Sequence, residues 1–145
     1  PYKIKIIGRT KNFINAFGEE LIQENADQAI EKACILTASE INEYTAYPIL
    51  LKEEIGVHEW LIEFNHPPSE IGKFRDILDD ELKKLNSDYN TKRSNNLILQ
   101  KPLIKELKKG TFYNWLKNKK KVGGQNKVPR LSNDKKIACQ IIDSQ

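Results

Sequence analysis

The chain has 145 residues, of which 39% are hydrophobic and 30% are charged, and this balance is typical of one compact domain with its own core. No apolar run approaches the roughly 20 residues of a membrane-spanning helix, and the first residues lack the charged and apolar regions of a signal peptide. The net charge is a modest +4. Since the sequence begins at Pro1 without a methionine, we expect residues 1–145 to be one domain of a longer protein.

The first half of the sequence predicts two short strands and a helix. Alternation over residues 2–6 and the apolar pair Phe13-Ile14 predict two strands around a turn within residues 2–17. Asn25 is expected to cap the helix, with Gln28 in the return position. The buried stripe of this helix should consist of Ala26, Ala29, Ile30, Ala33 and Cys34.

A hairpin is predicted from residues 43–51 and 57–65, which flank the turn Glu53-Glu54-Ile55-Gly56. Along its second strand, successive side chains should lie on opposite faces of the sheet. One face is expected to carry Trp60, Ile62 and Phe64, and the other Leu61 and Glu63.

The second half predicts three helices and one strand. Ser69 is expected to cap the most regular helix, whose apolar residues are Ile71, Phe74, Leu78, Leu82 and Leu85. A loop at 86–96 should lead to a strand near 102–108, and Gly110-Thr111 should open a helix with the apolar face Phe112, Trp115 and Leu116. Asn133 is expected to cap the last helix. The predicted fold class is α+β, with a small mixed or antiparallel sheet of about four to five strands flanked by helices.

The cysteines and histidines favour structural roles. Cys34 and Cys139 each lie among apolar residues on a helical pattern, so reduced, buried thiols of a cytoplasmic protein are favoured over a disulfide. His58 and His66 lack metal-ligand spacing, so no metal site is expected and a catalytic role for either is disfavoured.

Positive charge is concentrated in residues 101–130, which contain nine lysines and one arginine against the single acid Glu106. This segment carries +9, and the rest of the chain carries −5. Such asymmetry predicts an anionic partner, which is a nucleotide, a nucleic acid or an acidic surface of another domain. The lysine run Lys117–Lys121 is most simply a solvated helix end.

Residues 123–131, GGQNKVPRL, have the composition of a mobile loop that carries a cation. Gly123 and Gly124 allow dihedral angles closed to other residues, whereas Pro129 fixes φ. Lys127 lies between the flexible and the stiff part, and a lysine held in this way suits a phosphate or a developing oxyanion. The alternative is a solvated basic turn before the C-terminal helix.

Two motifs occupy the ends of the chain. The front motif is GRTKNFINAFGEEL, residues 8–21, and the back motif joins GTFYNWL, residues 110–116, to the loop GGQNKVPRL. Together they resemble the C-terminal domain of the auxin-responsive acyl-acid amido synthetases, a branch of the adenylate-forming superfamily, and imply a bacterial relative. The resemblance covers essentially the whole chain.

The resemblance implies an ATP-dependent, AMP-forming ligase that joins carbon to nitrogen. An N-terminal domain, absent from this chain, would bind ATP, Mg²⁺ and a carboxylic acid and form an acyl-adenylate, before the small domain rotates and the acyl group passes to an amine or amino acid. Lys11 matches the hinge, and Arg9 the arginine near the nucleotide. Lys127 matches the lysine that reaches the acyl carboxylate and α-phosphate, with Arg130 as a second phosphate contact. The isolated chain should bind no cofactor and be inactive.

Two other classes of function stay open. A nucleic-acid-binding module would explain the basic edge, although no strand has the aromatic and basic pattern with which RNA-recognition domains stack bases. Trp60 and Phe64 are spaced along one strand face, but that face is more simply core. A protein-interaction domain would also explain the basic edge but leaves the front motif without a purpose.

Overall fold

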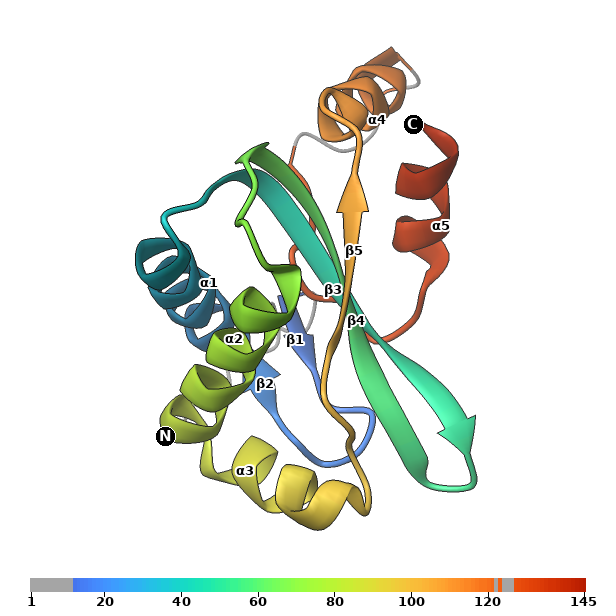
Figure 1. The fold of residues 1–145 in the computed structure, drawn as a ribbon. Coiled ribbons are helices and arrows are strands. Elements are labelled where there is room, and N and C mark those ends of the chain that lie inside the picture. The colour runs from blue at the N-terminus through green and yellow to red at the C-terminus, as the bar shows by residue number, and fades with distance from the viewer. Residues whose placement is uncertain (1–11, 122, 124–126) are drawn as a thin grey trace, which may run out of the picture.

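The computed structural model describes residues 12–121, 123 and 127–145. Its central sheet has three strands in the order β3 (Glu40–Lys52), β4 (Ile55–His66) and β5 (Leu103–Leu107). One face of this sheet is covered by α1 (Gln23–Thr37) and α2 (Ile71–Leu85). The other face packs against α4 (Thr111–Lys121) and α5 (Lys136–Asp143) (Figure 1). The predicted α+β class is confirmed, although the described strands divide between two sheets.

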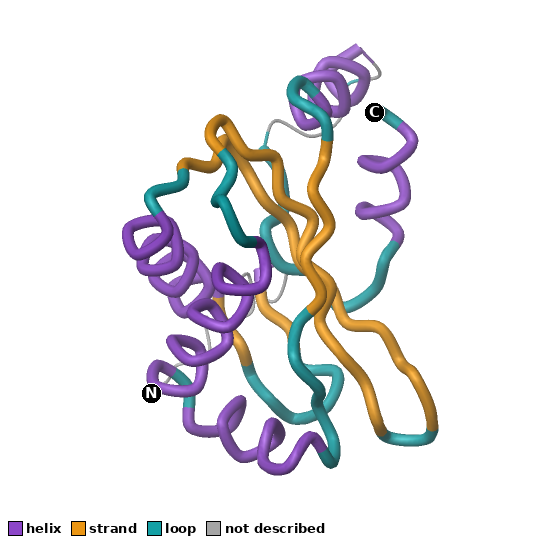
Figure 2. Tube along the Cα trace, viewed as in Figure 1, coloured by secondary structure: helices purple, strands orange, loops and turns teal. Residues whose placement is uncertain are grey.

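The predicted hairpin is confirmed and forms the centre of the domain. Strands β3 and β4 are antiparallel, and β5 runs parallel to β4, so the sheet is mixed. The turn end of the hairpin extends past β5 (Figure 2). Alternation along β4 separates two cores: Trp60, Ile62 and Phe64 lie in the first core under α1 and α2, and Leu61 lies in the second core with α4 and α5.

The predicted apolar stripes of α1 and α2 face the first core, with Cys34, Ile71 and Leu85 only partly buried, but the predicted caps are wrong. Strand β2 (Leu21–Ile22) runs directly into α1, so Asn25 lies inside the helix, where its Oδ1 accepts a hydrogen bond from the Ile22 N–H at 3.3 Å. Ser69 precedes Glu70, which is the residue before α2 and makes no side-chain capping bond. The polar residues Asn25 and Ser69 therefore predicted that a helix begins nearby, but not the residue at which it begins.

Residues 86–96 form helices rather than the predicted loop. The Asn86 side chain accepts a hydrogen bond from the Tyr89 N–H at 2.8 Å and caps α3 (Ser87–Arg93), which continues into the 3₁₀ helix η2 (Ser94–Asn96). Arg93 extends from α3 to α2, where its Nε donates to Asp79 Oδ1 at 2.8 Å, and both side chains are buried. This long-range ion pair stabilises a segment whose composition is typical of a loop.

The front strands differ in part from the prediction. Phe13–Ile14 forms β1, but its antiparallel partner is β2, which was not predicted. The remaining residues of the expected pair, 2–11, lie outside the described part of the chain.

The C-terminal region confirms α4 and α5 but not the cap of α5. Asn133 instead contacts the β1 region, where its Oδ1 accepts from the Asn15 N–H at 2.8 Å and its amide donates to the Phe13 carbonyl at 2.9 Å. Both cysteines are free, but Cys34 is only half-buried and Cys139 is exposed, so the prediction of two buried thiols is wrong. Within the described residues, no helix has the length and apolar character needed to cross a membrane.

Candidate functional site at the basic loop

Lys127 lies where the chain passes from the surface into the second core. Its side chain is exposed, whereas the next residue, Val128, is buried beside Phe112 and Trp115 of α4. Gly123 has φ +75°, a conformation that glycine adopts readily, and a Cβ there would meet no atom within 4 Å. Gly124 lies outside the described residues.

The residues after Lys127 are hydrogen-bonded along the free edge of β3. The Thr45 hydroxyl donates to the Pro129 carbonyl at 2.7 Å. The backbone of Ala46 both donates to the Arg130 carbonyl at 2.9 Å and accepts from the Ser132 N–H at 3.1 Å. The stiff half of the predicted loop is therefore an added edge segment of the sheet.

Arg130 is paired with two carboxylates from different elements. Its Nε donates to Glu43 Oε1 of β3 at 2.8 Å, and its Nη1 donates to Asp27 Oδ1 of α1 at 3.1 Å. Its guanidinium lies 5.3 Å from the centroid of the Tyr44 ring, and the Tyr44 hydroxyl donates to Asp27. Burial lowers the pKa of Arg130, but the hydrogen bond and charge of Glu43 outweigh it, so the net pKa is raised.

Burial raises the pKa of Tyr44, and the hydrogen bond to Asp27 raises it further, so this phenol stays protonated. The sequence pattern identified Arg130 but none of its partners, because these lie far away in the chain. Its role as a phosphate contact stays a prediction.

The start of α4 is fixed by a buried glutamate. The two carboxylate oxygens of Glu63 accept hydrogen bonds from the Gly110 and Phe112 N–H groups, each at 3.0 Å, and Asn42 donates a third at 2.9 Å. A carboxylate at a helix N-terminus also complements the helix dipole. The alternation along β4 predicts the face on which Glu63 lies, but gives no signal for this capping role.

The lysines of α4 are largely solvated. Lys117 and Lys120 are exposed, and Lys119 lies with its Nζ 5.9 Å from the centroid of the Trp115 ring. These positions agree with the interpretation of the run as a solvated helix end. Trp60 and Phe64, by contrast, are buried in the first core, so their face of the sheet is covered and does not offer a base-stacking surface.

Arg9 and Lys11 lie outside the described residues. The segment that follows them contacts β4 through Phe17 and Glu19. The buried Glu19 and His58 side chains pair at 2.6 Å, which sequence analysis missed because the two residues are 39 positions apart. The Phe17 ring packs so closely on Gly56 that a Cβ there would lie 2.0 Å from it. His58 thus has a structural partner in Glu19, and among the described residues it belongs to no group of three or more His, Cys, Asp or Glu side chains that could hold a metal ion.

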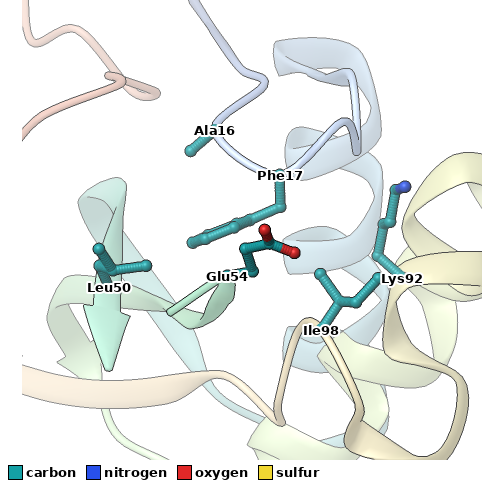
Figure 3. A pocket seen from close by; sticks show the side chains of 6 residues that line it. All are labelled: Ala16, Phe17, Leu50, Glu54, Lys92 and Ile98. Atoms are coloured by element: carbon teal, nitrogen blue, oxygen red, sulfur yellow. The ribbon is translucent and has the colours of Figure 1, made fainter. Parts of the chain in front are cut away.

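A half-open hollow of about 420 Å³ lies beside Phe17, at the turn end of the hairpin. Its lining is mostly apolar, with the Phe17 ring and the Glu54 carboxylate between Leu50 and Ile98, and Lys92 at its edge (Figure 3). Figure 1 shows that the turn end of the hairpin lies away from α4. This hollow therefore does not form one site with Lys127.

Comparisons with known proteins identify relatives of this fold. The family model described as the GH3 family C-terminal domain matches residues 24–136. Two similar solved structures are titled "GH3.15 acyl acid amido synthetase", with a TM-score of 0.68 and 17% identity, and "AtGH3.15 acyl acid amido synthetase in complex with 2,4-DB", with 0.67 and 15%. Each match covers 86% of this chain and 24% of the solved chain, so this chain spans about a quarter of their length. A comparison with curated proteins found no match.

Proposed function

The chain belongs to the GH3 family as its C-terminal domain, and we propose that it is the mobile lid of a larger ATP-dependent, AMP-forming acyl acid amido synthetase. The family expected from the sequence is confirmed, whereas a bacterial origin stays a prediction. The observation that carries the proposal is the position of Lys127, an exposed cation next to residues that are hydrogen-bonded to the sheet. The similar solved proteins are acyl acid amido synthetases, which supports the choice of reaction, although their likeness to this chain is one of fold.

In the proposed reaction, a preceding N-terminal domain binds a carboxylic acid and ATP, and the acid displaces pyrophosphate to give an acyl-adenylate. Lys127 Nζ neutralises the acyl carboxylate and the α-phosphate while negative charge accumulates between them. The lid then turns about Lys11, and an amine attacks the acyl carbon to form an amide and release AMP. Arg9 contacts the nucleotide, and Gly123 and Gly124 give the loop its freedom.

ATP and Mg²⁺ are proposed as ligands of the whole enzyme. Mg²⁺ prefers carboxylate and phosphate oxygens, and no three His, Cys, Asp or Glu side chains within residues 12–121, 123 and 127–145 are placed to hold a metal ion. The chemistry of the described residues thus fits a lid that supplies a cation. We assign the metal, the acid and most of the ATP contacts to the N-terminal domain.

The 145-residue chain alone is expected to fold but to show no ATP-pyrophosphate exchange, since it has its own cores but not the proposed acid and ATP sites. Trp60 lies in the first core and Trp115 in the second, so single-tryptophan variants report on each core separately. Within each variant, a fluorescence midpoint that coincides with the midpoint from far-UV circular dichroism would show one cooperative unit. The full-length protein with a carboxylic acid is the positive control, and exchange by the isolated chain would refute this division of labour.

The hinge assignment is tested by Lys11→Pro in the full-length enzyme. Proline fixes φ near −65° and restricts the preceding residue, so one of the two lid orientations should become inaccessible. Adenylate formation should survive, while amide formation from the adenylate should fall at least about tenfold. Both half-reactions must be measured on one folded preparation. Overall amide synthesis near wild type would show that position 11 is not the pivot.

A further inference from the structure

The segment that carries Lys127 is held by hydrogen bonds to side chains of β3 and α1. We infer that Arg130 and Thr45 are positioning residues for Lys127, an inference that rests on the proposed role of that lysine in adenylate formation. Both hold the chain within three positions after Lys127. Thr45 holds it through the Pro129 carbonyl, and Arg130 through its own guanidinium. Neither role was visible in the sequence, because the partners lie 84 to 103 residues away.

Thr45 fixes the backbone two residues after Lys127. The Thr45 side chain is buried, and its hydroxyl donates to the Pro129 carbonyl at 2.7 Å. Proline has no N–H, so its carbonyl is the only backbone group it offers for attachment. The flanking bonds of Ala46 to Arg130 and Ser132 fix the register of the same segment on β3. The backbone that follows Lys127 is therefore attached to β3 at Pro129, Arg130 and Ser132.

Arg130 attaches the segment to two elements at once. Its Nε and Nη1 reach Glu43 on β3 and Asp27 on α1, while the Tyr44 ring lies beneath the guanidinium. A planar fork can hold two carboxylates in fixed directions, whereas a lysine ammonium cannot reproduce this geometry. The Arg130 side chain therefore ties the end of the basic loop to β3 and α1, whereas α4, at the other end of the loop, packs in the second core.

The charges around Arg130 favour positioning over phosphate binding. Asp27, Glu43 and Arg130 together carry a net charge of −1. Two further carboxylates, Glu31 and Glu40, line the same hollow as Asp27 and Arg130. An approaching phosphate would meet like charges within a few ångströms, which is unfavourable near a protein surface. Lys127 is thus the cation of this motif that is suited to the reacting phosphate.

The test uses the full-length enzyme with Arg130→Gln and Thr45→Val, and it measures adenylate formation and transfer from a supplied acyl-adenylate separately. Each variant should lower adenylate formation about tenfold or more and leave transfer nearly unchanged, because misplacing a catalytic group by about 1 Å has effects of this size. Thr45→Ser keeps the hydroxyl and should restore the rate, whereas Arg130→Lys should not. Arg75→Gln, which removes the exposed pair with Asp76, is the matched control.

Double variants separate positioning from direct contact. In a Lys127→Ala background, Arg130→Gln and Thr45→Val should cause little further loss, since the group that they position is gone. Additive losses would overturn the inference, because they would mean that Arg130 acts on the phosphate itself or only on overall stability.

Trypsin cleavage of the Lys127–Val128 bond in the folded full-length protein gives a readout independent of activity. Cleavage should be faster in Arg130→Gln and Thr45→Val than in Arg75→Gln, and unchanged cleavage would overturn the inference. If Lys127→Ala leaves adenylate formation intact while Arg130→Gln and Thr45→Val are cleaved faster, the attachment of the segment is supported and the proposed function of Lys127 is refuted. The two ideas can therefore fail separately.

Discussion

Replacing Lys127 with alanine should slow adenylate formation by the full-length enzyme by a factor of several hundred. This corresponds to a rise of roughly 3–4 kcal/mol in the activation free energy, the usual cost of removing a group that stabilises an oxyanion. The reason is that the acid and the α-phosphate are both anionic, and the proposed lysine is the cation between them. Transfer of the acyl group from a supplied adenylate should fall much less. ATP-pyrophosphate exchange measures the first step, and amide formation from the adenylate measures the second.

Lys120→Ala is the matched control for this prediction. Lys120 is an exposed lysine of α4, in the same basic region of the chain, and its loss removes the same charge. If only the general positive potential matters, the two variants should behave alike and respond equally to salt. Equal losses in both half-reactions of Lys127→Ala would also contradict the assigned role.

Local periodicity predicted the longer elements of this fold, α1, β3, β4 and α2, because each of them has a regular apolar face. The alternation from Trp60 to Phe64 correctly separated two sides of β4. The pattern failed where a tertiary contact replaces local preference. Residues 86–96 read as a loop by composition, yet Arg93 reaches Asp79 of α2 and the segment folds as helix. A single sequence gives no signal for such a partner.

The same limit applies to the candidate site. The glycines, proline and lysine of the basic loop are neighbours in sequence, so Lys127 was found from its local pattern. Its anchoring was not found, because Thr45 and Asp27 are brought to the loop only by the folding of β3 and α1. The carboxylates around Arg130 also show why a motif cannot by itself distinguish a ligand contact from a structural ion pair.

Arg93→Met should destabilise the folded domain by about 3–5 kcal/mol, because it leaves the buried Asp79 carboxylate without its main cation. Lys83, at 3.6 Å, and the Tyr89 hydroxyl, at 2.7 Å, remain as weaker partners. The exposed pair of Arg75 and Asp76 gives a matched control, and Arg75→Met should cost less than about 1 kcal/mol. Urea denaturation of the three proteins at neutral pH measures these differences.

The effect of Arg93→Met should also depend on pH. Burial raises the pKa of Asp79, but hydrogen bonds from Arg93 and Tyr89 outweigh it, and the net pKa lies below the ordinary value. The ion pair therefore contributes its full stability above the unfolded pKa of about 3.9 and loses it as the pH falls through the lower folded value. Without Arg93, burial should raise the pKa of Asp79. As the pH falls, Asp79 should therefore become protonated at a higher pH in the variant than in the wild type, and this removes the cost of the unpaired buried carboxylate. The stability difference from wild type should be largest at neutral pH and shrink toward pH 4, and a constant difference would show that lost packing, rather than charge, is responsible.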